Sequence, residues 1–402
     1  MTPLFRKFLG INWLLFLNMI GLLVWGIYGI YNASSFYENA SLANKWRDQT
    51  QWGMAGLVVF FAAALVDYKW VRWGALPLYL CAIALEVALR VVGVERHDAK
   101  SWISIGGGAT IQPSQLAIVS GIVILAVVLG DLHRVFRWFR YHWLRLIVSG
   151  VLTAVPMAMV LKEPDLGSAA VWGPVFISML LVGSMPFRYL IVMTLGVLCV
   201  LPLAYFFGLK PYQKKRVEVF INMVTNKKVD IQGDAYMADK IQIAVGSAGF
   251  EGKGPLSEKV PGRHSIHRTF YSDVEAMSDF IYSVIVEEFG FRGGVLHIAG
   301  MALMLLQCVF VAFYARDQLG CMMVVGVVGM MFAHTMQHVG MNILMMPITG
   351  LPMPFTSYGG TFLVMCMFVM GLVQSVWIHR NINPVKKKKG DEEADPFADD
   401  DD

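Results

Sequence analysis

Hydrophobic residues occur along the chain in long runs, and these runs recur at short intervals from Leu9 to His379. A helix needs roughly 20 consecutive apolar residues to cross the hydrocarbon core of a bilayer, and most of the runs have about that length. Because backbone polar groups inside a bilayer must be paired within their own segment, each run is predicted to be a helix. We place ten spans at residues 9–32, 51–66, 70–94, 113–131, 144–161, 167–185, 187–208, 290–315, 320–346 and 358–379.

Composition supports the same class of protein. Hydrophobic residues make up 56% of the 402 residues and charged residues only 15%, which is outside the range of soluble globular domains. We therefore predict an all-α polytopic membrane protein with one membrane domain at residues 1–385. A long loop at about 209–278 separates the seventh span from the eighth, and residues 386–402 form a charged tail that we expect to be disordered.

Positive charges predict the orientation of the chain in the membrane. With the N-terminus in the cytoplasm, the loops on that side carry Arg6, Lys7, Lys69, Arg72, Arg134, Arg137, Arg140, Arg145, Arg188 and Lys386–Lys389. This distribution satisfies the positive-inside rule, and ten spans return the chain to the side where it began. Both termini are therefore predicted to be cytoplasmic. The partners that such a chain implies are membrane lipids, and we expect no nucleic-acid partner.

The long loop is the first candidate for a binding site. It carries eleven Lys and Arg residues against eight Asp and Glu residues, together with His264 and His267. This balance suits an anionic ligand such as a phosphate or a pyrophosphate headgroup. Anchoring of the loop to the phosphates of the bilayer surface explains the same charges equally well.

Acidic residues at membrane depth are the second candidate, because a charge there is costly and usually faces a cavity or a partner. Such residues are Glu86, Asp165, Asp279, Glu287 and Glu288. Glu86 lies four residues before Arg90 on one helix face, so these two are predicted to form an ion pair. Asp279 lies at the outer boundary of the membrane, with Glu287 and Glu288 deeper. A carboxylate at that boundary can deprotonate a substrate hydroxyl, or it can simply begin a helix.

Short motifs over nearly the whole chain resemble the SEDS family (shape, elongation, division and sporulation), whose members include RodA and FtsW. The motifs are Ser101-Trp102, Gln112-Pro113-Ser114, Glu163 to Ser168, Tyr212-Gln213 with Arg216, Gly246 to Gly254, Ser278 to Ile281, Glu287 to Gly290 and Pro347 to Gly360. Two of the motifs resemble RodA, the elongation member, more than FtsW, the division member; they are Tyr212-Gln213 with Arg216 and Gly252-Lys253-Gly254. The resemblance implies a SEDS-type fold of about ten transmembrane helices.

The resemblance implies an inverting peptidoglycan glycosyltransferase that polymerises lipid II at the outer face of the bacterial inner membrane. By carry-over, Asp279 is the catalytic residue and takes the proton of an acceptor hydroxyl, while undecaprenyl pyrophosphate leaves the donor. Arg216, Lys253 or a divalent cation such as Mg or Mn would stabilise the leaving charge, with Arg216 preferred because its planar fork suits phosphate oxygens. A class B penicillin-binding protein and the elongation or division machinery are the implied partners.

The resemblance also assigns substrate contacts. These are Arg216, Gln213, Lys253, Trp102, Gln112, Ser114, Asp165, Ser357 and Tyr358. Glu287, Glu288, Gly359 and Gly360 are expected to shape the cavity. The Gly- and Pro-rich stretch 347–360 is predicted to form a re-entrant wall, because irregular backbone at membrane depth is tolerated only where protein buries it or a cavity is lined.

Two other functions stay open, and departures from the family pattern support the second of them. The departures are Ser101, Gln115, Ile118, Met277 and His338. A flippase for a lipid-linked precursor would also use many spans and intramembrane charges. A scaffold with weak activity would keep the fold and recruit a penicillin-binding protein. We favour the active enzyme, because the departures leave Asp279 in place.

Overall fold

The computed structural model describes residues 3–380, apart from 97–98, 107–108, 164, 184, 190, 194, 197–209, 226, 231, 234, 255–264 and 272–273. Its helices are α1 Pro3–Leu9, α2 Trp13–Ser34, α3 Ala40–Ala43, α4 Lys45–Leu65, α5 Val71–Val92, α6 Pro113–Gly130, α7 Leu132–Val135, α8 His142–Lys162, α9 Leu166–Val182, α11 Pro211–Val224, α12 Tyr236–Gly246, α13 Ile266–Phe270, α14 Ile281–Phe313, α15 Gln318–Asn342 and α16 Gly360–Ile378. Two short 3-10 helices lie at Tyr68–Trp70 and Arg137–Arg140, and three strands are β1 Val94–Arg96, β2 Ala99–Gly106 and β3 Ala109–Ile111.

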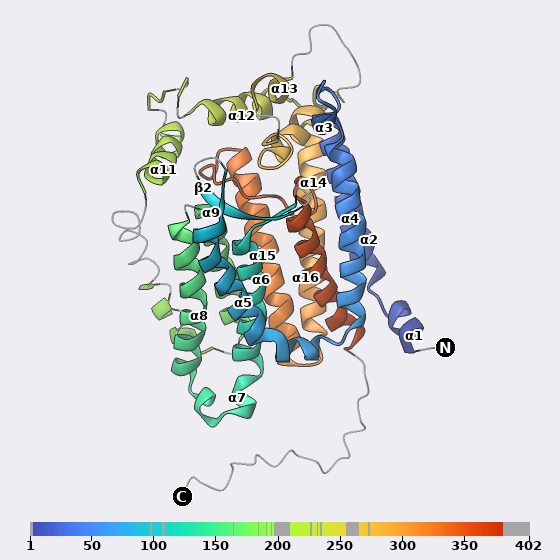
Figure 1. Cartoon of the computed structure of the whole chain (residues 1–402), viewed down its shortest axis with the longest axis vertical. Helices are drawn as coiled ribbons and strands as arrows, with labels where there is room; N and C mark the ends of the chain where they lie inside the picture. The colour runs from blue at the N-terminus through green and yellow to red at the C-terminus, as the bar shows by residue number, and fades with distance from the viewer. Residues whose placement is uncertain are drawn as a thin grey trace, which may run out of the picture.

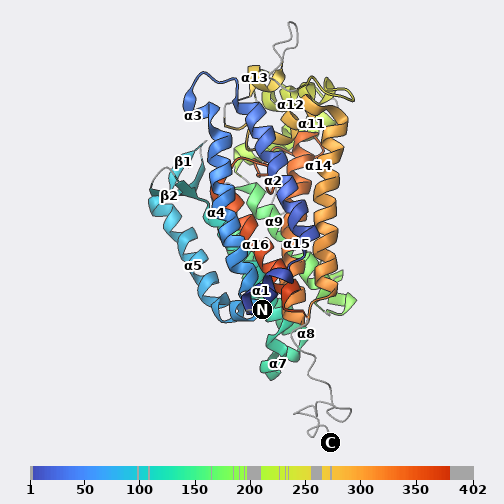
Figure 2. The same cartoon turned by 90° about the vertical axis from the view of Figure 1, so that its right-hand side faces the viewer.

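The long helices run side by side and form one bundle (Figure 1, Figure 2). Helices α11, α12 and α13 cover one end of the bundle, which we call the loop end. Helices α1 and α7 and the last turn of α16 lie at the opposite end, which we call the terminus end. Every side chain that the sequence proposed for substrate chemistry and that the structure describes belongs to segments at or near the loop end.

The described helices match nine of the ten predicted spans. Within the described residues, seven helices are long and apolar enough to cross a membrane, and α9 is a shorter apolar helix of 17 residues. Helix α4 begins at Lys45, well before the predicted start at residue 51. The prediction missed the first two turns because they are polar and carry no hydropathy signal. Much of the predicted span 187–208, part of the long loop and the tail 386–402 lie outside the described residues.

Helices α6 and α15 form the centre of the bundle. Helix α15 packs against α9, α14, α6 and α16, and α6 packs against α5, α8 and α9 as well. Both are buried around most of their circumference, whereas α5 and α8 expose most of their apolar side chains at the periphery. Close approach depends on small residues: a Cβ at Gly121 of α6 would overlap the Trp172 ring of α9.

Helix α14 is not a straight rod. Gly290 has φ 71° and ψ −168°, so the chain reverses there and residues 281–289 run back along the residues that follow. The rings of Tyr282 and His297 lie 6.1 Å apart, whereas 15 residues of straight helix would separate them by about 22 Å. The predicted span 290–315 therefore corresponds to the second limb of a helical hairpin.

A small antiparallel sheet, which the sequence did not predict, joins α5 to α6 near the loop end. Its strand order is β1-β2-β3, and the pair Ile103–Ile111 aligns β2 with β3. The prediction of an all-α fold missed it because the strands are short and lie between two long apolar helices. The sheet carries Trp102 on β2 and leads directly into Gln112 and α6.

Candidate functional site

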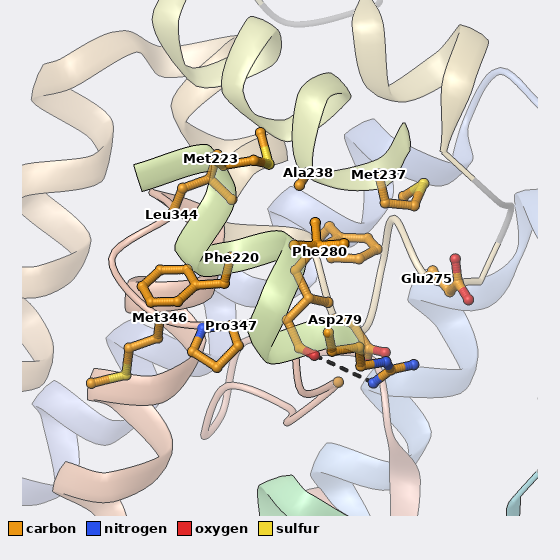
Figure 3. A pocket seen from close by; sticks show the side chains of 14 residues that line it. Phe220, Met223, Met237, Ala238, Glu275, Asp279, Phe280, Leu344, Met346 and Pro347 are labelled. Carbon is orange, nitrogen blue, oxygen red and sulfur yellow. Dashed lines mark hydrogen bonds between the residues drawn. The ribbon is translucent and has the colours of Figure 1, made fainter. Parts of the chain in front are cut away.

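A cavity of about 220 Å³ opens at the loop end between four segments (Figure 3). Helix α11 contributes Arg216, helix α12 contributes Met237, the turn 274–280 contributes Glu275 and Asp279, and the stretch after α15 contributes Ile348 and further residues. A cation and two carboxylates thus share one concave site, the usual setting for a binding or catalytic function.

Apolar side chains form the other side of this cavity. Phe220, Met223, Leu344 and Met346 lie together, on the side away from Glu275 (Figure 3). Leu344 has φ 54°, a conformation that is uncommon for a residue with a side chain and is often found at functional sites. Sequence reasoning missed these residues, because an apolar residue in a membrane protein gives no signal of its own.

Asp279 lies where two irregular segments meet. It precedes Phe280, the N-cap of α14, and it is partly exposed to the cavity. Gly350 has φ 72°, and a Cβ at this glycine would lie 3.1 Å from Asp279 Oδ2. The residues 347–350 therefore pass close to the carboxylate because one of them lacks a side chain.

Arg216 lies on the exposed face of α11 and reaches across to the stretch after α15. Its Nη1 donates to the carbonyl oxygen of Ile348 at 3.3 Å. Arg216 also lines a second, smaller pocket, together with Gln213 and Thr349 among others. Gln213 is almost fully buried, and its Oε1 accepts from the Lys210 N–H and so caps the first turn of α11.

Asp165 is the centre of a polar cluster between α6 and α9. Its carboxylate accepts from Gln112 Nε2 at 2.7 Å, from the Ser114 hydroxyl at 3.4 Å and from the Ser168 N–H at 2.9 Å, the last being the N-cap bond of α9. Burial raises the pKa of Asp165 in spite of these donors. The predicted contact residues Gln112, Ser114 and Asp165 thus lie together, and Ser168 joins them. Gln115 Nε2 donates to the Ser168 hydroxyl at 3.1 Å.

Lys253 does not line the cavity but belongs to a buried network at the tip of the α14 hairpin. Its ammonium pairs with Glu287 at 2.6 Å, and Glu287 also accepts from His267 Nδ1 at 2.7 Å and from the Ile266 N–H at 2.6 Å. Glu288 lies beside it, with an oxygen 3.7 Å from His267 Nε2. These bonds fasten the long loop to the hairpin tip.

The predicted depth order of the acidic residues is wrong. Glu287 and Glu288 were placed deeper than Asp279, on the assumption that the chain enters the membrane at residue 279. Because it reverses at Gly290, Glu287 and Glu288 lie at the tip beside α13, the part of the loop end farthest from the termini (Figure 1). Asp279 lies at the other end of the limb, nearer the end of α15.

Of the remaining predicted residues, Ser357 and Tyr358 contact the turn that carries Asp279. Ser357 is buried and donates its hydroxyl to the Ser278 carbonyl at 2.6 Å. The Tyr358 ring faces Lys45 at 5.2 Å, and Gly359 N–H donates to Gln49. A Cβ at Gly360 would overlap the Trp52 ring, so this glycine brings α16 close to α4. Trp102 lies on β2 and does not line the described cavity.

The departures from the family pattern lie in packed surroundings. Met277 and Ile118 are fully buried apolar residues, and the Ser101 hydroxyl donates to the Glu163 carbonyl at 3.4 Å. His338 Nδ1 lies 2.7 Å from the Leu351 carbonyl oxygen and so supports the stretch after α15. The partner of Glu86 was predicted to be Arg90, whose side chain lies outside the described part of the structure.

A divalent cation was one possible source of charge stabilisation. Among the described residues, no group of three or more His, Cys, Asp or Glu side chains is arranged to hold a metal ion. We therefore assign no chemical step to a cation.

The fold and the cavity define a polytopic membrane protein with a charged site at one end of its helix bundle. Residues 10–382 match the cell cycle protein family of FtsW, RodA and SpoVE, and the chain belongs to this family. It is a multi-pass membrane protein of the SEDS type.

Relatives match over most of their length. The chain is 27% identical to the peptidoglycan glycosyltransferase RodA of Treponema pallidum, covering 91% of this chain and 97% of that protein. It is 27% identical to the stage V sporulation protein E of Bacillus subtilis, covering 88% and 93%.

Solved structures share the fold. A chain in a peptidoglycan synthase complex, described as coordinating polymerization and crosslinking, matches with a TM-score of 0.72 at 24% identity over 93% of this chain and 99% of that one. The rod shape determining protein RodA of Thermus thermophilus matches with a TM-score of 0.65 at 24% identity over 93% and 98%.

Proposed function

We propose that the protein is a peptidoglycan glycosyltransferase that polymerises lipid II into glycan strands, for cell elongation and rod shape or for division. One observation carries the proposal: Asp279 and Arg216 line the same cavity at the loop end, next to an apolar wall. A lipid-linked sugar pyrophosphate presents a hydroxyl, an anionic linker and a hydrocarbon chain. The cavity offers a carboxylate, a guanidinium and apolar side chains for these three parts.

In the proposed reaction Asp279 accepts the proton of a sugar hydroxyl on the acceptor, while the oxygen of that hydroxyl attacks the anomeric carbon of the donor. The new C–O bond forms as the bond to the pyrophosphate oxygen breaks, with inversion at that carbon. Undecaprenyl pyrophosphate leaves with the electron pair, and Arg216 stabilises its negative charge. Gln213, Gln112, Ser114, Asp165 and Trp102 remain proposed substrate contacts.

We revise the proposed roles of Lys253 and Ser357. Because Lys253 pairs with a buried carboxylate and the Ser357 hydroxyl bonds to a backbone carbonyl, we propose that both support the site rather than bind substrate. Glu287 is tied to the loop in the same way, which removes one of the charges that a flippase path would need. The glycosyltransferase is therefore the better proposal.

Orientation and partners follow from the proposal. We place the loop end outside the bacterial cytoplasmic membrane and both termini in the cytoplasm, as the arginines near α7 favour. The membrane domain then spans residues 1–385, and 386–402 form a cytoplasmic tail. A class B penicillin-binding protein is the proposed partner, since a structural neighbour comes from a complex said to coordinate polymerization and crosslinking.

The test is polymerisation of lipid II by the purified protein together with its cognate penicillin-binding protein. Wild type should form glycan strands, and Asp279→Ala should form none. Glu275→Gln is the matched control, because Glu275 is the second carboxylate of the cavity and lies one helical turn earlier. If Asp279→Ala formed glycan strands and Glu275→Gln did not, the assignment of Asp279 as the base would be wrong. No strands from wild type would favour the scaffold or the flippase.

A further inference from the structure

The turn that carries Asp279 ends before the first hydrogen bond of α14. The first intrahelical bond runs from the Val284 N–H to the Phe280 carbonyl at 3.2 Å. The carbonyl groups of Met277, Ser278 and Asp279 come before it and have no helical N–H to accept from. Buried backbone acceptors need partners, so other segments must supply them.

Each of these three carbonyl groups receives a donor from elsewhere in the bundle. The Tyr358 N–H donates to Met277 O at 2.8 Å, and the Ser357 hydroxyl donates to Ser278 O at 2.6 Å. Both donors come from the stretch before α16. The third donor, to Asp279 O at 3.1 Å, is the side-chain amide of Asn342 at the end of α15.

Asn342 replaces a helical hydrogen bond. In a regular helix the Ser283 N–H would donate to Asp279 O, four residues earlier. Here the Ser283 N–H donates instead to Asn342 Oδ1 at 3.3 Å, and Asn342 Nδ2 donates to Asp279 O. Nδ2 also donates to the His338 carbonyl at 2.8 Å, and the side chain is fully buried. The carboxamide thus keeps the backbone of Asp279 out of the helix.

Gln49 of α4 holds the other two donors in place. Its Nε2 donates to Ser357 O at 3.0 Å, and its Oε1 accepts from the Gly359 N–H at 3.2 Å. This two-point contact fixes the backbone on both sides of Tyr358. Gln49 is fully buried although it belongs to the polar start of α4, where a glutamine would otherwise face water.

We propose that Asn342 and Gln49 are positioning residues that set the place of the Asp279 carboxylate, through the carbonyl groups of residues 277–279. The inference rests on the proposed glycosyltransferase function, in which Asp279 is the base. Neither side chain lines the cavity, and both are fully buried with their polar atoms bonded to backbone, so their proposed role is indirect. A base that is displaced by about 1 Å can lose about a hundredfold in rate while substrate still binds.

The test compares Asn342→Leu and Gln49→Met with Gln374→Met. Gln374 is the matched control, because it is also fully buried and also binds a backbone at two points, donating to Asn12 O and accepting from Asn12 N, each at 2.9 Å. It does so in the last part of α16, the helix whose last turn lies at the terminus end (Figure 1). All three variants lose two or more buried hydrogen bonds and should lose similar stability in a melting experiment.

In the lipid II assay we expect Asn342→Leu and Gln49→Met to lower kcat by about 10- to 100-fold with KM changed by less than about threefold. Gln374→Met should stay within about twofold of wild type. The double variant Asn342→Leu with Gln49→Met should lose less than the product of the two single losses, because both act on one turn. Equal losses in Gln49→Met and Gln374→Met, or a loss confined to KM, would overturn the proposal.

Hydrogen exchange gives a second measurement that needs no activity. The amides of residues 274–284 should exchange faster in Asn342→Leu and Gln49→Met and unchanged in Gln374→Met. Unchanged exchange in all three would overturn the positioning role even in an active enzyme. Faster exchange together with an inactive wild type would instead overturn the glycosyltransferase and leave the architecture of the turn as inferred.

Discussion

Gly290 and Gly252 interlock at the tip of the α14 hairpin, and replacing Gly290 by alanine tests this geometry most directly. Gly290 has φ 71° and ψ −168°, a region that only glycine adopts without strain. A Cβ there would overlap Phe250 O and Gly252 N, which are backbone atoms and cannot rotate away. Strain of about 1–3 kcal/mol and overpacking of about 1–3 kcal/mol add to roughly 2–6 kcal/mol.

The assay is hydrogen exchange of the amides that bridge the loop and the hairpin. The Lys253 N–H donates to Glu287 O at 2.8 Å, and the Phe291 N–H donates to Gly249 O at 2.9 Å. A local loss of about 3 kcal/mol should speed their exchange by roughly a hundredfold, since about 1.4 kcal/mol is a factor of ten. Polymerisation should fall as well, because the hairpin limb leads directly to Asp279.

The matched control is Gly246→Ala on the neighbouring helix α12. A Cβ at Gly246 meets nothing within 4 Å, so alanine fits at this last residue of α12 without overlap. Exchange at the tip should therefore be unchanged in this variant. If Gly290→Ala also exchanged like wild type and polymerised lipid II normally, the reversal at Gly290 would not be the geometry of the folded protein.

Three further variants test the charged groups. Glu287→Gln should loosen the loop by about 3–5 kcal/mol, because it removes a buried charge that pairs with Lys253; exposed Glu251→Gln should change nothing in the same exchange assay. Burial raises the pKa of Asp165, so the contribution of this group to stability is full below about pH 4 and is lost as pH rises through the raised pKa. The melting temperature of Asp165→Asn minus that of wild type should therefore be larger at pH 7.5 than at pH 4.5. The same difference at both pH values would contradict this. Arg216→Lys should lower kcat/KM about tenfold, because it keeps the charge but loses the planar fork; activity equal to wild type would remove Arg216 from the site.

Sequence patterns predicted the transmembrane helices well, because a bilayer imposes a length and a composition that a single chain reveals. They failed where tertiary contacts override the local pattern. The reversal at Gly290 lies at the predicted start of the span 290–315, and nothing in the local pattern shows that the preceding residues form a second limb; only the contact between Gly290 and Gly252 reveals the turn. Gln49 looks like a loop residue, because a buried amide is recognisable only from the backbone that it binds.

The candidate site was predicted in part. Asp279 and Arg216 meet at one cavity, as a carboxylate and a basic loop at one boundary should. Lys253 was a plausible phosphate ligand by charge, but the network at the hairpin tip pairs it with Glu287. Charge alone cannot distinguish a lysine that binds substrate from one that is paired with a buried carboxylate, because the partner lies 34 residues away in the sequence.

The interlocked glycines also limit which substitutions the chain can tolerate during evolution. An obstacle made of side chains can be removed by a second mutation that shrinks a neighbour, so such positions drift in compensating pairs. At Gly252 and Gly290 the obstacle is backbone on both sides, and no substitution elsewhere can shorten it. Homologues of this chain should therefore retain glycine at each of the two positions. A genetic screen for suppressors of Gly290→Ala should return reversion to glycine and no second-site changes.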